Sequence, residues 1–206
     1  MKSNKILSHF RKADTVIFEI MKGVNFNEWI APKKAKRDSI FFQALCREVI
    51  GQQLAGKAAN AINKRFAKLF RKREITPDAL LKLPNQTLRD TGMSWAKAGY
   101  VKNIADAYIT KIVEFDKLYK MDDEEIVKQL TTIKGVGNWT AEMFLIFTLG
   151  REDVFSFGDL GLRKGFSKVY GVENPKKEEV EKVVSKWTPY KSYGSIALWH
   201  SLDNEK

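Results

Sequence analysis

Residues 133–141 read Ile133-Lys134-Gly135-Val136-Gly137-Asn138-Trp139-Thr140-Ala141. A short helix is expected before them, over residues 124–130, and a strongly apolar helix after them, over residues 139–149. The two glycines permit a tight turn and leave an approaching ligand free of Cβ obstruction. The second helix begins with unpaired backbone N–H groups and the positive end of its dipole, which together suit a phosphate. The stretch therefore predicts a helix, a tight hairpin and a second helix that can bind an anion.

This hairpin predicts a contact that positions nucleic acid without reading its sequence, because backbone groups make it. The candidate contact residues are Lys134, Gly135, Val136, Gly137 and Thr140. A Gly-Val-Gly turn alone is explained equally well as a structural turn. The net charge of +11 at pH 7 favours phosphate binding, since a protein of that sign attracts a polyanion such as nucleic acid.

The composition predicts a folded protein. The chain has 206 residues, 44% of them hydrophobic and 30% charged, which suffices for one domain or two small domains that share a cleft. The longest unbroken apolar run, residues 143–147, is far too short to cross a membrane. Residues 1–12 lack the apolar region of a secretory signal, so we expect the cytoplasm and nucleoid of a prokaryote or the nucleus of a eukaryote.

Cysteine and histidine are too rare for the usual metal centres. The single cysteine, Cys46, excludes a disulfide within the chain, a four-cysteine iron–sulfur cluster and a cysteine-based zinc site. Only His9 and His200 could add imidazole ligands, so a histidine-rich metal site is not expected.

Apolar residues recur at helical spacing along most of the chain. Phe41, Leu45 and Val49 share one helical face, and Val180 and Val184 share another. Convincing strand alternation is absent from the sequence. We therefore predict an all-α protein of about ten short helices.

Two runs of like charge have alternative interpretations. Six basic residues between Lys64 and Arg73 form either a solvated helix face or a phosphate contact, and the sequence does not decide between them. Four consecutive acids, residues 122–125, are expected in the first turn of a helix, where the helix dipole favours negative charge.

Asp159 directly precedes an expected helix that runs to Tyr170, and an N-cap is the commonest role at such a position.

Several segments together resemble the helix-hairpin-helix (HhH-GPD) DNA glycosylase superfamily. The hairpin is followed by Asp159 eighteen residues after Ala141, and residues 50–55 (IGQQLA) match the turn between two helices of that family. Residues 92–100 (GMSWAKAGY) resemble its G-x-x-x-x-K-x-x-Y/A stretch. Residues 187–193 (WTPYKSY), with Trp199 beyond them, resemble the closing motif of the alkylation-repair branch, the 3-methyladenine DNA glycosylases of type II. The match extends over residues 40–200.

The resemblance implies a fold of two helical lobes around a DNA-binding cleft. Residues 40–145 are expected to form a central lobe that ends in the helix-hairpin-helix. Residues 1–39 and 146–206 are expected to form the second lobe, which is discontinuous in sequence. Asp159 is expected at the cleft, opposite the hairpin.

The resemblance also implies roles for single residues. Asp159 falls at the position of the catalytic aspartate of the family. The pocket for the flipped base is expected to use Trp139 and Trp199, with Tyr190 and Phe157 as weaker candidates; packing in the core is the alternative for each aromatic residue. The gap that the flipped base leaves is filled by Gln53 or Leu54, between which the sequence does not choose.

The position of the lysine nucleophile of bifunctional members is held here by Trp139, so a monofunctional enzyme is expected. Lys134 is nearby but precedes Gly135 in the hairpin. The resemblance implies no required cofactor and no iron–sulfur cluster. It suggests a monovalent cation, Na⁺ or K⁺, on the backbone carbonyls of Thr131, Ile133 and Val136.

The implied activity is hydrolysis of the N-glycosidic bond of alkylated purines, 3-methyladenine and 7-methylguanine, in base excision repair. Such a purine already carries positive charge and leaves without a strong general acid, while a carboxylate stabilises the oxocarbenium-like transition state. The expected partner is double-stranded DNA that contains alkylated bases, bound by a monomer without a membrane. The alternatives are a glycosylase for deaminated or mismatched bases and a non-catalytic helix-hairpin-helix DNA-binding module.

Overall fold

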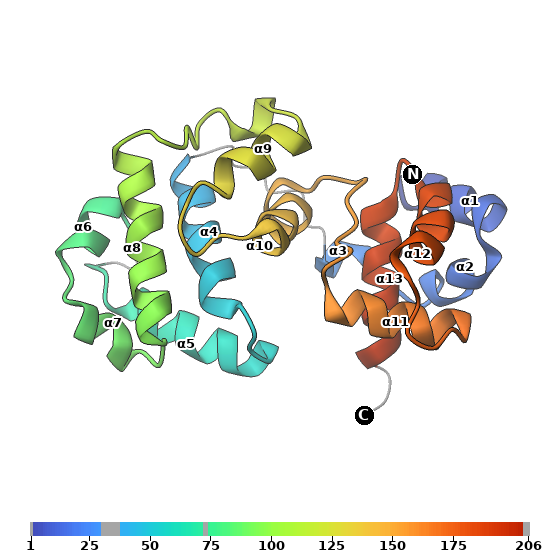
Figure 1. The fold of residues 1–206 in the computed structure, drawn as a ribbon, viewed down its shortest axis with the longest axis horizontal. Coiled ribbons are helices and arrows are strands. Elements are labelled where there is room, and N and C mark those ends of the chain that lie inside the picture. The colour runs from blue at the N-terminus through green and yellow to red at the C-terminus, as the bar shows by residue number, and fades with distance from the viewer. Residues whose placement is uncertain (1, 30–37, 72–73, 204–206) are drawn as a thin grey trace. The chain divides into compact units, whose positions relative to one another are not determined.

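The computed structural model describes residues 2–29, 38–71 and 74–203 (Figure 1). These residues form helices joined by turns and loops, and no β-strand occurs among them, so the all-α prediction is confirmed. The chain divides into two compact units. We call Lys33–Phe144 the hairpin unit, and Met1–Pro32 together with Leu145–Lys206 the aspartate unit. None of the described helices is long and apolar enough to span a membrane.

The hairpin unit is organised around one central helix, α8. Its helices are α4 (Asp38–Gly51), α5 (Gly56–Lys68), α6 (Pro77–Lys82), α7 (Asn85–Asp90), α8 (Trp95–Ile109), a 3-10 turn (Leu118–Lys120), α9 (Asp123–Leu130) and α10 (Asn138–Met143). In Figure 1, α8 runs beside α4, α6 and α7, and it packs against all three. The helix α10 packs against α9 and α4.

Local sequence explains where two of these helices begin. Ser94 caps α8 by accepting a hydrogen bond from the backbone N–H of Lys97 at 3.2 Å. Asp122 and Glu125 form a reciprocal capping box at the start of α9, which satisfies two backbone N–H groups. The acidic run at residues 122–125 therefore lies where the sequence predicted, in the first turn of a helix.

The basic run between residues 64 and 73 has mixed surroundings. Lys64 and Lys68 are exposed on α5, in agreement with a solvated face. Arg65 is different, because its Nε donates to the carbonyl of Thr91 at 2.7 Å and so ties α5 to the end of α7. Residues 72 and 73 lie outside the described part of the chain.

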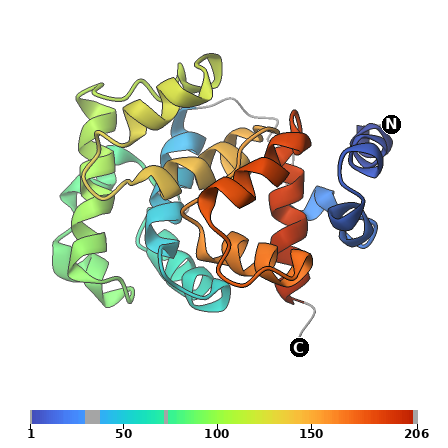
Figure 2. The same cartoon turned by 45° about the vertical axis from the view of Figure 1, so that its right-hand side comes forward.

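The aspartate unit joins the two ends of the chain. Its helices are α1 (Lys2–Ala13), α2 (Thr15–Met21), α3 (Phe26–Trp29), all but the first residue of a π-helix (Phe144–Leu149) that follows α10, α11 (Leu160–Tyr170), α12 (Lys177–Val184), a 3-10 turn (Ser185–Trp187) and α13 (Lys191–Asp203). The helix α13 packs against α11 and α2 (Figure 2). The core of this unit includes Phe10, Ile17, Leu162 and Trp187.

Two glycines let the helices of this core approach closely. A Cβ on Gly165 of α11 would lie 2.6 Å from the carbonyl oxygen of Leu198, and a Cβ on Gly194 would lie 2.6 Å from Cζ3 of Trp187. Only glycine fits at such a separation, since real Cβ atoms do not come that close. This packing brings the start of α11 alongside the end of α13.

Candidate functional site

The hairpin, residues 131–137 between α9 and α10, contains two glycines in different situations. Gly135 has a φ of +104°, and a Cβ there would lie 2.6 Å from Cβ of Tyr100. The fold therefore requires glycine at this position, for both backbone conformation and space. Gly137 has a φ of −97°, and a Cβ there would meet no atom within 4 Å. Nothing in the packing of the hairpin unit demands a glycine at 137, so its bare surface remains open to a ligand.

Side-chain amides hold the hairpin in place through its carbonyl groups. Asn103 Nδ2 donates to the carbonyl of Lys134 at 3.0 Å. Gln52 Nε2 donates to the carbonyl of Gly135 at 3.0 Å and to Oγ1 of Thr140 at 2.8 Å. Because Thr140 is only 2% exposed and its hydroxyl is bonded inside the fold, it remains a candidate DNA contact only through its backbone N–H. The side chain of Lys134, by contrast, is exposed.

The helix α10 presents its N-terminus at the end of the hairpin. Gly137 is the N-cap residue and makes no side-chain capping bond, and the first helical hydrogen bond runs from Ala141 N–H to the Gly137 carbonyl. The first turn of any α-helix carries N–H groups that its own carbonyls do not reach. The positive side of the helix dipole adds to them. This end of α10 therefore offers backbone N–H groups to an anion, and the phosphate site itself stays a prediction.

The α4–α5 turn, residues 52–55, carries both candidates for filling the gap in the duplex. Gln53 is exposed and has a φ of +57°, which is uncommon for a residue other than glycine. Leu54 is 39% exposed, a high value for leucine. A pocket of ≈ 510 Å³ lies within the hairpin unit and is lined by residues of this turn, of the hairpin and of the first half of α8.

Asp159 is the N-cap of α11 in the aspartate unit. Its Oδ1 accepts a hydrogen bond from the backbone N–H of Leu162 at 2.7 Å, which confirms the predicted capping role. The same oxygen accepts a second bond from Nε1 of Trp199 at 3.0 Å. The residue is 8% exposed. A carboxylate that only caps a helix does not need an indole donor, so this arrangement orients Asp159 beyond the needs of the helix.

Gly161 leaves room for the pairing of Asp159 and Trp199. A Cβ at this position would lie 3.0 Å from Oδ1 of Asp159 and 3.0 Å from both Cδ1 and Nε1 of Trp199. Any larger residue would press on the carboxylate and on the indole at once. The sequence named Asp159 and Trp199 separately, and the structure brings them into direct contact.

Trp199 also belongs to an aromatic cluster with Trp29 and Phe147. Its ring centroid lies 5.5 Å from that of Phe147 and 6.4 Å from that of Trp29, and the planes of the two indoles are inclined by only 8°. The centroids of Trp29 and Phe147 are 6.5 Å apart. The three rings come from α3, the π-helix and α13, so this aromatic cluster collects segments that are distant in the sequence beside Asp159.

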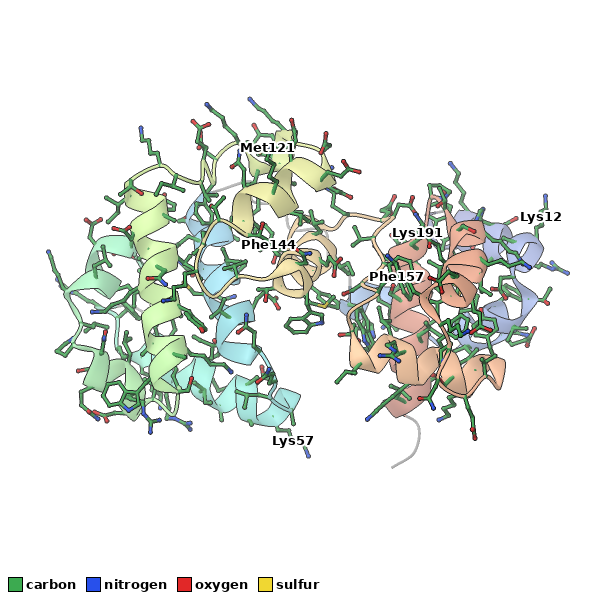
Figure 3. All side chains as sticks on the ribbon, in the orientation of Figure 1. Lys12, Lys57, Met121, Phe144, Phe157 and Lys191 are labelled. Atoms are coloured by element: carbon green, nitrogen blue, oxygen red, sulfur yellow. The ribbon has the colours of Figure 1, made fainter. Side chains whose placement is uncertain are left out.

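The other predicted pocket residues have different surroundings. Phe157, labelled in Figure 3 on the segment before α11, packs edge-on against Phe155 and lies 5.4 Å from Nζ of Lys177. Tyr190 is 9% exposed, packs edge-on against the ring of His9 and belongs to the core of its unit. Its predicted place in the base pocket finds no support in this packing. Trp139 is half-buried on α10, in the hairpin unit.

Comparison with known proteins identifies the family. Residues 46–190 match the family model described as "HhH-GPD superfamily base excision DNA repair protein". The chain belongs to this superfamily. Over 171 residues it is 33% identical to the DNA-3-methyladenine glycosylase 1 of Schizosaccharomyces pombe, which corresponds to 82% of this chain and 75% of the relative. It is 32% identical to the DNA-3-methyladenine glycosylase of Saccharomyces cerevisiae, over 86% of this chain and 63% of the relative.

Solved structures of this HhH-GPD superfamily share the fold. The 3-methyladenine DNA glycosylase of Schizosaccharomyces pombe, solved in complex with abasic DNA, has a TM-score of 0.82 at 30% identity, with 97% of this chain and 95% of that chain covered. The DNA-3-methyladenine glycosidase of Bacillus halodurans has a TM-score of 0.76 at 30% identity, with 100% and 92% covered.

The monovalent cation that the superfamily resemblance suggested would bind to backbone carbonyls of the hairpin. Thr131 is the C-cap of α9, and the carbonyl of Ile133 accepts a hydrogen bond from the N–H of Val136 at 2.9 Å. A carbonyl oxygen has a second lone pair, so this bond leaves Ile133 able to ligate. The described residues contain no group of three or more His, Cys, Asp or Glu side chains that could hold a metal. The carbonyl donor set fits a hard monovalent ion, and the site itself stays a prediction.

Two aromatic residues beside Trp199 were not predicted from the sequence as part of the site. Trp29 lies outside every motif and is separated from Asp159 by most of the chain. Phe147 is part of the apolar run after the hairpin, where a phenylalanine indicates core packing as readily as a pocket. Neither spacing nor composition signals that the two rings meet Trp199.

Proposed function

We propose that this chain is a monofunctional DNA glycosylase that hydrolyses the N-glycosidic bond of alkylated purines, chiefly 3-methyladenine and 7-methylguanine, in base excision repair. The observation that carries the proposal is the Asp159 carboxylate, held on one oxygen by Trp199 Nε1 and by the N–H of Leu162, beside an aromatic cluster. The similarity to relatives named DNA-3-methyladenine glycosylases supports it.

Binding to duplex DNA is assigned to the hairpin unit. The N-terminus of α10 and the bare Gly137 offer a phosphate backbone N–H groups without a side chain in the way. Contacts of this kind are independent of base sequence, which a repair enzyme needs because lesions occur anywhere. The formal net charge of +11 adds attraction to DNA at long range. That the fission yeast protein was solved in complex with abasic DNA supports DNA binding by this chain.

The chemical step is assigned to Asp159. Cleavage of an N-glycosidic bond passes through a state with positive charge on the sugar, which a nearby carboxylate stabilises. Two N–H donors on Oδ1 fix the orientation of the carboxyl group, and the N-terminus of α11 favours negative charge there. The same carboxylate can orient or activate the attacking water.

The flipped base is assigned to the aromatic cluster of Trp29, Phe147 and Trp199. A purine alkylated at N3 or N7 is cationic, and aromatic faces attract cations by the charge distribution of the ring. Such a base is also a good leaving group, so the site needs no separate acid to protonate it. This explains why a single well-placed carboxylate suffices for these substrates, whereas a neutral base demands further help.

Monofunctional chemistry follows from Trp139. The superfamily resemblance places the lysine nucleophile of bifunctional members at this position, and an indole cannot form a Schiff base. The product is therefore an intact strand with an abasic site, which breaks only after treatment with alkali. We further propose that Gln53 or Leu54 fills the gap in the duplex and that the hairpin carbonyls can bind Na⁺ or K⁺. The protein is proposed to act as a monomer in the nucleoid of a prokaryote or the nucleus of a eukaryote.

The test is base release from duplexes that carry one defined base each. The substrates contain 3-methyladenine, 7-methylguanine, hypoxanthine or uracil, and each reaction is divided into samples with and without alkali. We expect free methylated purines, with strand breaks only in the samples treated with alkali. Faster release of uracil or hypoxanthine would redirect the assignment to deaminated bases. Tight binding to methylated DNA without any release would leave a DNA-binding module.

A further inference from the structure

One motif remains without a role in the proposed function, namely residues 92–100 at the start of α8. Lys97 and Tyr100 of this motif are followed by Asn103, so the three side chains recur every three residues along α8. Residues three apart are neighbours on the surface of a helix. Each of the three contacts a segment that the proposed function assigns to DNA, either the α4–α5 turn or the hairpin.

Lys97 holds the start of the α4–α5 turn. Its Nζ donates to the carbonyl of Ile50 at 2.9 Å and to the carbonyl of Gln52 at 2.6 Å. These carbonyls lie at the C-terminal end of α4, where the last carbonyls of a helix lack partners within the helix and attract a cation. Burial lowers the pKa of Lys97, so the two carbonyl bonds compensate for part of the lost hydration of its charge.

Gln52 continues the connection to the hairpin. Its backbone carbonyl accepts from Lys97, while its side-chain amide donates to Gly135 and Thr140. Tyr100 packs against Gly135 closely enough to exclude a Cβ, and Asn103 binds the carbonyl of Lys134. The α4–α5 turn and the hairpin are therefore both anchored on α8 and joined to each other through Gln52.

Gln53, next to these anchoring bonds, has a strained backbone conformation. A φ of +57° costs a non-glycine residue free energy and persists only where the surroundings enforce it. The Lys97 bonds restrain the chain immediately before Gln53, at residues 50 and 52. The exposed Gln53 and Leu54 thus follow directly after residues that the half-buried ammonium group of Lys97 restrains.

We propose that Lys97 is a positioning residue for base flipping, which sets the α4–α5 turn relative to the hairpin so that Gln53 and Leu54 can occupy the gap in the duplex. The proposal rests on the proposed function. A side chain on a loose turn cannot hold a base out of the stack, because the extruded state must compete with restacking and re-pairing. Lys97 therefore acts before the chemical step and touches neither the base nor the sugar.

The decisive comparison is Lys97→Met against Lys102→Met. Both lysines are on α8, and Lys102 Nζ reaches a carbonyl of α6, that of Leu81, at 3.4 Å, away from both segments. Single-turnover excision is measured on a lesion with a normal opposite base and on the same lesion opposite an abasic site. The second substrate lowers the cost of extrusion because pairing is already lost.

For Lys97→Met we expect about 10- to 100-fold slower excision of the paired lesion, in the range of a misplaced positioning group. We expect most of this loss to disappear on the lesion opposite an abasic site. Lys102→Met should match the wild type on both substrates. An equal loss on both substrates, or no loss on either, would overturn the proposal, since a general structural defect does not depend on pairing.

Two further variants keep the result interpretable. Lys97→Arg retains the charge and the hydrogen-bond donors, so it should recover at least part of the excision rate. If Lys97→Met does not fold, Gln52→Met takes its place: it removes the side-chain link from the turn to Gly135 and Thr140 and should show the same dependence on pairing. Fluorescence of 2-aminopurine at the target position reports unstacking without cleavage. A wild type that raises this fluorescence but releases no base contradicts the proposed function alone, and a normal rise in Lys97→Met contradicts the positioning role alone.

Discussion

The two units of this protein use opposite kinds of chemical groups for their proposed tasks. In the hairpin unit, backbone N–H groups are the proposed phosphate ligands, and side chains such as Gln52 and Asn103 hold the backbone in place. In the aspartate unit, the proposed catalytic group is a side-chain carboxylate, and a backbone N–H together with the Trp199 indole holds it. A backbone site depends on conformation and space, whereas a side-chain site depends on chemical identity.

The glycines of the two units illustrate this difference. Gly135 is required by a positive φ and by the ring of Tyr100, so it shapes the hairpin itself. Gly161 is not needed for a left-handed backbone conformation and instead leaves room for the Asp159–Trp199 bond. Substitutions in the first unit should therefore change folding and binding, and substitutions in the second should change the rate of the chemical step.

The largest effect is expected for Asp159→Asn. Asparagine is isosteric, caps helices as well as aspartate does and can still accept from Leu162 and Trp199, so folding should be unaffected. Without the carboxylate charge, excision should fall by about 10³-fold, the range measured for lost electrostatic stabilisation of a transition state. Single-turnover base release measures the loss, and titration of DNA with an abasic site should give binding within about 3-fold of wild type. Retained turnover would remove Asp159 from the mechanism.

The next effect concerns the hairpin, where two alanine variants should behave differently. Gly135→Ala forces a Cβ against Tyr100 at a positive φ and should destabilise the protein by about 2–4 kcal/mol in urea unfolding. Gly137→Ala places its Cβ in open space at a φ of −97°, so stability should change by less than about 0.5 kcal/mol. DNA binding by Gly137→Ala should nevertheless weaken, because the methyl group stands where the phosphate approaches. Equal stabilities of the two variants would contradict this account of the hairpin.

The sequence predicted those features that depend on local pattern. Apolar spacing indicated helices, the acids at residues 122–125 indicated a helix start, and the position of Asp159 before α11 indicated an N-cap. Each of these inferences needs only the residues within one or two turns of a helix. The family resemblance then named Asp159 and Trp199, but not the hydrogen bond between them.

Long-range packing could not be predicted in this way. Gly135 and Gly137 are the same letter two residues apart, yet only the position of Tyr100 makes the first one indispensable. Tyr190 and Trp199 were both candidates for the base pocket, Tyr190 the weaker one, and the structure places Tyr190 in the core of its unit and Trp199 on Asp159. Trp29 contacts Trp199, which lies near the other end of the sequence. Such distinctions arise from tertiary structure, which neither periodicity nor spacing encodes.

A smaller effect should separate orientation of Asp159 from its charge. Gly161→Ala presses a Cβ on Oδ1 of Asp159 and on the Trp199 indole, both 3.0 Å away, and should shift the carboxylate. Excision should fall by about 10-fold while binding to abasic DNA is unchanged, since the hairpin lies in the other unit. Gly158→Ala is the matched control, because a Cβ at 158 meets no atom within 4 Å. A rate for Gly161→Ala equal to that of Gly158→Ala would show that the indole contact does not matter for catalysis.

The smallest effect is expected for Lys134→Gln, which tests whether charge contributes to a contact that the backbone dominates. The Lys134 side chain is exposed beside the N-terminus of α10, while its carbonyl is bound by Asn103, so the hairpin should keep its shape in the variant. Loss of one phosphate contact should reduce the slope of log binding constant against log salt by about 1 and weaken binding about 2- to 5-fold at moderate salt. The rate of excision at saturating enzyme should not change. Lys82→Gln, at the exposed end of α6, is the control and should leave the slope as it is. If Lys134→Gln also leaves the slope unchanged, the hairpin binds through its backbone alone, and the contrast between the two units becomes sharper still.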